Sequence, residues 1–139
     1  MNSRDRILQA LDHREPDRVP FDLGGTGLST THVTAYRNLR RYLGLPAVEA
    51  RVAFVAEQLV LVDEYLADRL QTDVRPILPG TASSFDYVLR DEGPYEAYTD
   101  EWGIGWRMPK EGGFYYDMYR HPLENAESLA EFENYVMPD

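Results

Sequence analysis

Aromatic residues are concentrated in one stretch of this 139-residue chain, and their spacing restricts how that stretch can fold. Ten of the seventeen phenylalanine, tyrosine and tryptophan residues fall between Phe85 and Tyr119. Apolar residues alternate with others on both sides of Gly112-Gly113, which is typical of two strands joined by a turn. The alternating positions are Trp102, Ile104, Trp106 and Met108 before the turn and Phe114, Tyr116 and Met118 after it. The pattern predicts an antiparallel hairpin with one aromatic face.

A further strand pair is predicted upstream, where segments 85–90 and 95–98 flank the turn signal Gly93-Pro94. Downstream, Ser128 and Glu131 have the spacing of a capping box, which predicts a short helix that ends near residue 135. We therefore expect a β-ribbon over residues 81–123, followed by a C-terminal helix and tail over residues 124–139.

The first eighty residues carry helix and strand signals in alternation. Ser3 is a suitable cap for a helix over residues 4–12. The apolar run 18–23 opens into the glycine-rich segment 24–27, which fits a buried strand followed by a permissive loop. This order is that of the first βα unit of a (β/α)8 barrel.

The next elements are predicted from caps and turn residues. Thr30 or Thr31 is expected to cap a helix that Gly44 and Pro46 end. Residues 50–62 are compatible with either helix or strand. After them, Asp63 is expected to cap a helix over residues 64–70, and residues 74–78 are expected to form a second barrel-like strand.

The overall composition restricts the class of protein. The formal net charge of −10 opposes binding to nucleic acid and to anionic membrane surfaces. No apolar run approaches the roughly 18 residues of a membrane span, and the charged N-terminus does not resemble a secretory signal. Cysteine is absent, which excludes disulfides and thiolate ligands. We expect a single cytoplasmic domain over residues 1–139.

Five stretches, taken in order and spacing, resemble the N-terminal portion of the uroporphyrinogen decarboxylase-like superfamily, which also contains cobamide-dependent methyltransferases. They are Arg4 with Pro16-Asp17-Arg18-Val19-Pro20, Asp22-Leu23-Gly24-Gly25, Tyr36 to Leu45, Asp73 to Gly80, and Asp100-Glu101-Trp102-Gly103. The family fold is a (β/α)8 barrel, which needs roughly 250 residues. The resemblance therefore implies an α/β chain that forms the N-terminal fragment of such a barrel and carries an antiparallel aromatic β-ribbon.

Within this superfamily the chain is more similar to the methyltransferase branch. Segment 23–27 stands where the decarboxylases carry an arginine-rich segment that holds substrate carboxylates. The resemblance implies the N-terminal component of a cobamide-linked methyltransferase, which lines the substrate pocket and is inactive alone. Corrinoid and zinc belong, on this resemblance, to a complete assembly, because the family's metal ligands lie later in the sequence. The residues His13, His32 and His121 are too scattered for a preformed metal site, so we expect no metal in this chain.

The loop after the first expected strand supplies four candidate substrate-binding residues. Asp22 ends that strand, where barrel residues reach substrate, although its carboxylate is also suited to accept backbone N–H groups of the loop. Gly24 and Gly25 allow close approach of backbone to a ligand, and turn geometry alone also explains them. Thr26 is the hydroxyl residue within segment 23–27 and is a candidate donor to a ligand.

Two further candidates lie outside the loop. Arg75 lies in an expected strand, where it is suited to hold a carboxylate or to form an internal ion pair. Trp102 is suited to stack on a flat ligand or to pack in the protein.

The expected partners follow from the incomplete barrel. Either a barrel-completing protein or further copies of this chain should cover its exposed edges, and a corrinoid protein is a further possible partner. Two alternatives remain open at this point: a component of a uroporphyrinogen-type decarboxylase, and a non-catalytic binding or assembly module.

Overall fold

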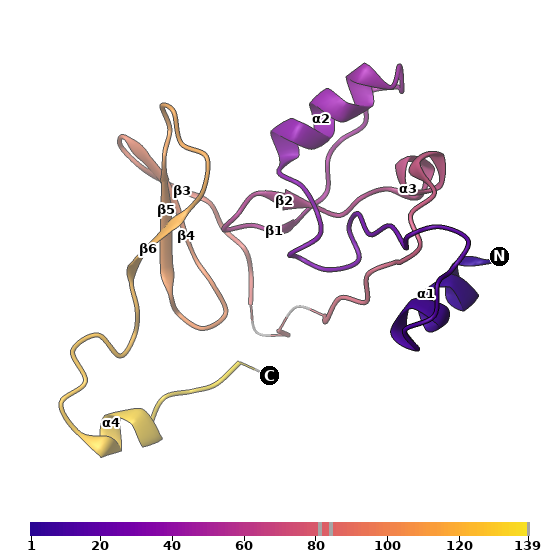
Figure 1. The fold of residues 1–139 in the computed structure, drawn as a ribbon. Coiled ribbons are helices and arrows are strands. Elements are labelled where there is room, and N and C mark those ends of the chain that lie inside the picture. Colours follow the sequence, from indigo (N-terminus) through magenta and orange to yellow (C-terminus); the bar gives the residue numbers. More distant parts are fainter. Residues whose placement is uncertain (81, 84, 139) are drawn as a thin grey trace. The chain divides into compact units, whose positions relative to one another are not determined.

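The structure, a computed structural model, describes residues 1–80, 82–83 and 85–138 and divides the chain into two compact units (Figure 1). Unit 1 spans Met1–Leu78 and unit 2 spans Pro79–Asp139. Residues 81, 84 and 139, which the expected ribbon and tail include, lie outside the described residues.

Unit 1 contains three helices and one short hairpin. The elements are α1 (Ser3–Leu11), α2 (Val33–Tyr42), β1 (Val52–Phe54), β2 (Leu59–Val60) and α3 (Glu64–Leu70). Strands β1 and β2 pair in antiparallel register, with Val52 opposite Val60, so the segment that periodicity left open is a hairpin. The predicted helices are confirmed, with ends that differ by one or two residues.

The helix caps of unit 1 agree only partly with the sequence. Asp63 caps α3 as predicted, and its Oδ1 accepts the N–H of Leu66 at 3.1 Å. The predicted caps of the other two helices are wrong: the side chain of Asn2 caps α1, and His32 Nδ1 caps α2. Gly44 has a φ of +67° just after α2, which is the left-handed residue that the sequence predicts.

The core of unit 1 lies between α2, β2 and α3. Leu66 and Val60 are almost completely buried, and Tyr36 reaches them from α2. The complete cluster of buried residues is Val33, Tyr36, Val60, Val62, Leu66 and Ala67. Burying a side chain of this size contributes about 1.5–3 kcal/mol, so these few contacts hold the three elements together.

The expected fold class, an N-terminal fragment of a (β/α)8 barrel, is wrong. Both sheets among the described residues are antiparallel, and segments 18–23 and 74–78 form no strand. Just before the second segment, the N–H of Asp73 donates to the carbonyl of Phe21 at 2.7 Å. The N–H of Phe21 donates to the Asp73 side chain instead of a neighbouring strand, and Pro20 and Pro76 have no N–H to donate. A parallel ladder therefore does not form.

Unit 2 is a four-stranded antiparallel meander with a short helix. The elements are β3 (Arg90–Glu92), β4 (Tyr95–Thr99), β5 (Gly105–Pro109), β6 (Asp117–Arg120) and α4 (Leu129–Glu133). The strands lie in the order β3-β4-β5-β6, so each pairs with its neighbour in sequence. The hairpin predicted around Gly112-Gly113 is present as β5 and β6, and the capping box of Ser128 and Glu131 is confirmed. The predicted strand alternation is wrong at Phe114 and Tyr116, which lie before β6. The strand expected over 85–90 contains only its last residue, and Trp102 lies in a turn before β5.

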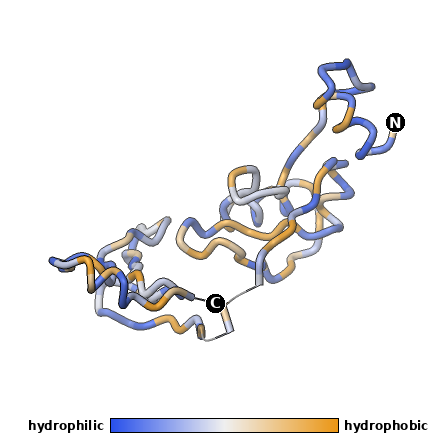
Figure 2. Tube along the Cα trace, turned by 90° about the horizontal axis from the view of Figure 1, so that it is seen from below, coloured by the Kyte–Doolittle hydropathy of each residue, from blue (hydrophilic) through white to orange (hydrophobic). Residues whose placement is uncertain are grey.

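Tyrosine and tryptophan side chains form the small core of unit 2. The ring of Tyr98 stacks on Trp106 with centroids 6.4 Å apart, and it meets Tyr116 edge-on at 5.1 Å. On the opposite face of β4, the guanidinium of Arg107 lies over Tyr95 at 4.6 Å. In both units, apolar segments alternate with polar ones along the trace (Figure 2). Each unit has a small core and also exposes large apolar side chains, such as Ile77 in unit 1 and Val136 in unit 2.

Candidate functional site

Four charged residues from distant segments meet in unit 1, and we call them the Asp73 clasp: Arg6, Asp17, Arg18 and Asp73. The Asp73 side chain is completely buried. It accepts Arg6 Nη1 at 2.5 Å, Arg18 Nη1 at 2.7 Å and the N–H of Phe21 at 2.8 Å. Arg6 also donates to both oxygens of Asp17, at 2.7 and 2.9 Å. The clasp thus joins α1 to the segments around residues 17–21 and 73.

The clasp keeps its carboxylates ionised. Burial by itself would raise the pKa of Asp73, but hydrogen bonds from Phe21 N–H, Ser3, Arg6 and Arg18 outweigh it and lower the pKa to about 2. Hydrogen bonding to Arg6 holds the pKa of Asp17 well below its usual range. Neither carboxylate is therefore suited to exchange protons near neutral pH, and the chemical role of the clasp is to position the backbone around it.

The glycine-rich loop begins directly after the clasp. Asp22 Oδ1 accepts the N–H of Gly25 at 2.8 Å, which closes a turn within the loop. Gly24 has a φ of +96°, and a Cβ at this position would lie 2.9 Å from Val62 Cγ2. A Cβ on Gly25 would lie 2.6 Å from Val74 Cγ2. Both glycines are thus required by close packing inside unit 1.

Thr26 completes the loop through bonds to Ser29. The N–H of Thr26 donates to Ser29 Oγ at 2.9 Å, and the two hydroxyls lie 3.2 Å apart. Thr26 Oγ1 also accepts the N–H of Leu28 at 3.2 Å. The hydroxyl that the sequence offers as a ligand donor is therefore part of the loop's own hydrogen bonding.

Arg75 is bonded to α3 rather than aimed at a free ligand site. Its Nε donates to Glu64 at 2.7 Å and its Nη2 to Asp68 at 2.8 Å. Its Nη1 donates to the hydroxyl of Thr72 at 2.8 Å. Hydrogen bonding to Glu64 is the main cause of the raised pKa of Arg75. The arginine lines a cavity of about 760 Å³ together with Arg6 and other residues of unit 1.

Trp102 lies in unit 2 and is about half exposed. Asp100 holds the turn that carries it, because Asp100 Oδ1 accepts the N–H groups of Trp102 and Ile104 at 2.9 and 2.8 Å. The hydroxyl of Tyr135 donates to the carbonyl of Trp102. The indole lines an apolar cavity of about 310 Å³ with Ile104 and His121.

The structure thus brings together only some of the six candidate residues. Asp22, Gly24, Gly25 and Thr26 share one loop, and Gly25 packs near Val74, the neighbour of Arg75. Trp102 belongs to the other unit. Asp73, the centre of the arrangement, is not predictable from the sequence, because nothing near it indicates partners 55 and 67 positions away.

No metal centre is formed by the residues that the structure describes: no group of three or more histidine, aspartate or glutamate side chains is placed to hold an ion. His32 caps α2, and His121 lines the cavity beside Trp102. The described residues therefore do not fit a zinc ion.

Comparison with known proteins adds no relative: no protein-family model, curated protein or solved structure significantly matches the chain. Within the described ranges, none of the helices has the length and apolar character needed to cross a membrane.

Proposed function

We propose that this chain is the N-terminal component of a uroporphyrinogen decarboxylase-like, cobamide-linked methyltransferase. In this proposal it supplies walls of the substrate pocket, through the loop of Asp22 to Thr26, and works in the cytoplasm. A partner polypeptide supplies the metal ligands and binds the corrinoid. The proposal rests on the sequence resemblance and does not require that this chain itself form parallel βα units.

The observation that carries the proposal is the Asp73 clasp. Arg18 and Asp73 belong to two of the stretches on which the resemblance rests, and they are bonded at 2.7 Å across 55 positions of sequence. Asp22 and Gly25 lie four and seven positions after Arg18, and Gly25 packs on Val74. Stretches that are separate in sequence thus contact one another in unit 1. This supports the proposal that they form a single motif with one functional role.

The arrangement supports a positioning role for the loop. The N–H groups of Gly24, Gly25 and Thr26 are all bonded within the loop, to Ser29 and Asp22. A loop whose donors are already satisfied offers a ligand a fixed surface for packing rather than free amides. Such preorganisation lowers the cost of ordering on binding.

A second candidate, a non-catalytic binding or assembly module, is favoured by the exposed apolar surface of unit 1. Leu28 and Ile77 are almost completely exposed, and Val19 is 83% exposed. These residues lie next to the loop and to the clasp segments in sequence. Apolar surface of this kind is typical of regions that associate with another protein.

The methyltransferase component and the non-catalytic module differ in whether a partner adds zinc and methyl transfer. The test is to purify the chain alone and with the product of any adjacent reading frame, then measure zinc content and methyl transfer from methylcobalamin. We expect neither zinc nor transfer with the chain alone, and both in the complex, with transfer reduced at least tenfold by Gly25→Val in the loop. A copurifying complex without either property would favour the assembly module. Stoichiometric zinc in the isolated chain would contradict the proposal.

A further inference from the structure

Helix α2 has a cationic face in a strongly acidic protein. The helix contains Arg37, Arg40 and Arg41 and no acidic residue, although the whole chain has a net charge of −10. The acidic excess lies mainly in unit 2, which has four basic and thirteen acidic residues, against ten and eleven in unit 1. Three arginines on ten residues of helix are therefore a local concentration of positive charge.

The three arginines line one cavity of about 280 Å³. Its remaining lining residues are Leu45, Ala47 and Val48, from the segment that follows α2. The cavity thus has cationic side chains on one wall and apolar side chains on the other. No carboxylate is among these lining residues.

Arg40 builds the cavity rather than offering its charge to it. The side chain is 6% exposed, and its Nη1 donates to Asp63 Oδ2 at 2.5 Å. Its Nη2 and Nε donate to the carbonyl of Pro46 at 2.9 and 3.2 Å. These bonds hold the segment of Leu45 and Val48 against the helix, and Asp63 neutralises the guanidinium.

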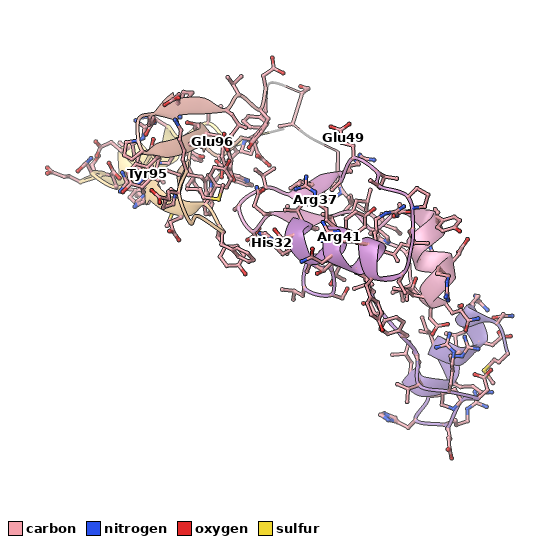
Figure 3. The ribbon with its side chains drawn as sticks, turned by 90° about the horizontal axis from the view of Figure 1, so that it is seen from above. His32, Arg37, Arg41, Glu49, Tyr95 and Glu96 are labelled. Atoms are coloured by element: carbon pink, nitrogen blue, oxygen red, sulfur yellow. The ribbon has the colours of Figure 1, made fainter. Side chains whose placement is uncertain are left out.

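Arg37 and Arg41 keep their charge available. Among the residues that the structure describes, neither forms an ion pair, and Arg41 bonds only the side-chain oxygen of Asn38, at 3.1 Å. Both are exposed on α2, where Figure 3 labels them together with Glu49 of the following segment. Glu49 makes no ion pair with either of them in this part of the chain.

The helix dipole explains the position of only some of these arginines. A cation in the last turn interacts favourably with the helix dipole, which accounts for Arg40 and Arg41. Arg37 lies in the middle of the helix and gains little from it. Like charges four positions apart on a helix also oppose helix formation, so the pair of Arg37 and Arg41 is unfavourable unless an anion lies between them.

We propose that this cavity binds the oxyanion group of a small ligand, a carboxylate or phosphate ester that carries an apolar body. The guanidinium groups of Arg37 and Arg41 are suited to hold two oxygens by charge-assisted hydrogen bonds. Leu45, Ala47 and Val48 form the apolar wall for the rest of the ligand. A cavity of this volume is near the lower limit of small-molecule sites, which restricts the ligand to a few non-hydrogen atoms beyond its anionic group.

The site is independent of the function proposed above, because it uses neither the glycine-rich loop nor a metal. Its test is titration of the full chain with phenyl phosphate, benzoate and inorganic phosphate, followed by calorimetry and by NMR of the arginine side-chain Nε–H groups. We expect saturable binding of phenyl phosphate or benzoate, weakened by added salt, with inorganic phosphate at least fivefold weaker because it has no apolar part. The stronger of the two aryl probes identifies the anionic group.

The variants test whether the arginines recognise the ligand. Arg37→Gln with Arg41→Gln should weaken binding at least tenfold, whereas Arg37→Lys with Arg41→Lys keeps the charge and should weaken it less. The matched control is Arg4→Gln with Arg69→Gln, which removes two exposed arginines of α1 and α3 and should leave binding unchanged. All these side chains are exposed, so far-UV circular dichroism should be the same for each variant. The proposal is overturned if no probe saturates, or if the control loses as much affinity as the Arg37 and Arg41 variant.

Discussion

The two units of this protein reach a stable structure by different means. In unit 2 every strand pairs with its neighbour in sequence, from β3 to β6, and Tyr98 joins the rings of Trp106 and Tyr116 across the sheet. In unit 1 the decisive contacts are distant in sequence, since Asp73 bonds Arg6 and Arg18. The comparison teaches that unit 2 depends on local pairing and apolar contact, whereas unit 1 depends on a buried charge cluster.

The largest expected effect comes from breaking that cluster. Asp73→Ala removes the buried carboxylate that Arg6 Nη1, Arg18 and the N–H of Phe21 share, and Arg6 keeps only Asp17 as its ion-pair partner, which should destabilise unit 1 by about 3–5 kcal/mol. Unit 2 should be unaffected. Helix ellipticity and tryptophan fluorescence report on different units, because both tryptophans lie in unit 2 and three of the four helices found among the described residues lie in unit 1. Urea unfolding followed by ellipticity at 222 nm should shift, while the tryptophan fluorescence transition should not.

The control for this variant is Asp12→Ala, which removes an exposed ion pair with Arg14. Such surface pairs contribute at most about 1 kcal/mol, so neither transition should move appreciably. Equal shifts in Asp73→Ala and Asp12→Ala would show that the clasp is unimportant.

The corresponding change in unit 2 is Tyr98→Ala. Tyr98 is almost completely buried and contacts three other aromatic rings, from Tyr87, Trp106 and Tyr116. Truncation of a buried aromatic ring costs about 3–5 kcal/mol, and here most of the small core is lost. We expect the tryptophan fluorescence of unit 2 to resemble that of the unfolded protein. The ellipticity transition of unit 1 should remain in place, and its loss would contradict independent units.

Low pH should destabilise unit 1 more than unit 2, as Asp73→Ala should. The folded-state pKa of Asp73 is lowered to about 2, so its stabilising contribution is complete above its unfolded value near 3.8 and disappears as the pH falls toward 2. Asp17 and Asp63, also in unit 1, have lowered pKa values as well. In unit 2 the carboxylates with a lowered pKa, Asp91 and Glu131, are exposed and contribute little to stability. Ellipticity should therefore fall between pH 4 and pH 2 while the tryptophan signal persists.

The smallest expected effects come from one substitution made in each unit. Gly44 and Gly112 have φ angles of +67° and +70°, and a Cβ at either position would meet no other atom. An alanine in this conformation costs about 1–2 kcal/mol. Gly44→Ala should lower only the unit 1 transition, and Gly112→Ala only the unit 2 transition. If either variant lowered the transitions of both units, the two units would unfold together.

The same contrast explains which parts of the fold the sequence could predict. Gly44 ends α2, Asp63 caps α3, and Gly112-Gly113 marks a turn, because each of these signals acts within a few residues. The hairpins of unit 2 are predictable for that reason. Trp102 was expected within a strand, yet Asp100 accepts two backbone N–H groups and turns the chain there.

The parts that could not be predicted depend on partners far away in sequence. The apolar run 18–23 has the composition of a strand, but Phe21 gives its N–H to a side chain 52 positions away. Asp22, Thr26 and Arg75 are predicted from the sequence as substrate-binding residues, and the sequence does not reveal that they bond to Gly25, Ser29 and α3. The arginines of α2 were predictable in principle, since three of them without an acidic residue stand out in an acidic chain.

Hydrogen–deuterium exchange, measured peptide by peptide on Asp73→Asn, tests the central comparison most directly. Asparagine keeps the size of the side chain and can still accept the N–H of Phe21, but it removes the charge and replaces one of the two oxygens that accept from the arginines by an NH2 group. We predict that peptides from α1, α3 and residues 17–26 lose protection at neutral pH, while peptides from residues 90–120 exchange as in the unaltered protein. Unchanged protection throughout unit 1, or an equal loss in both units, would contradict the account.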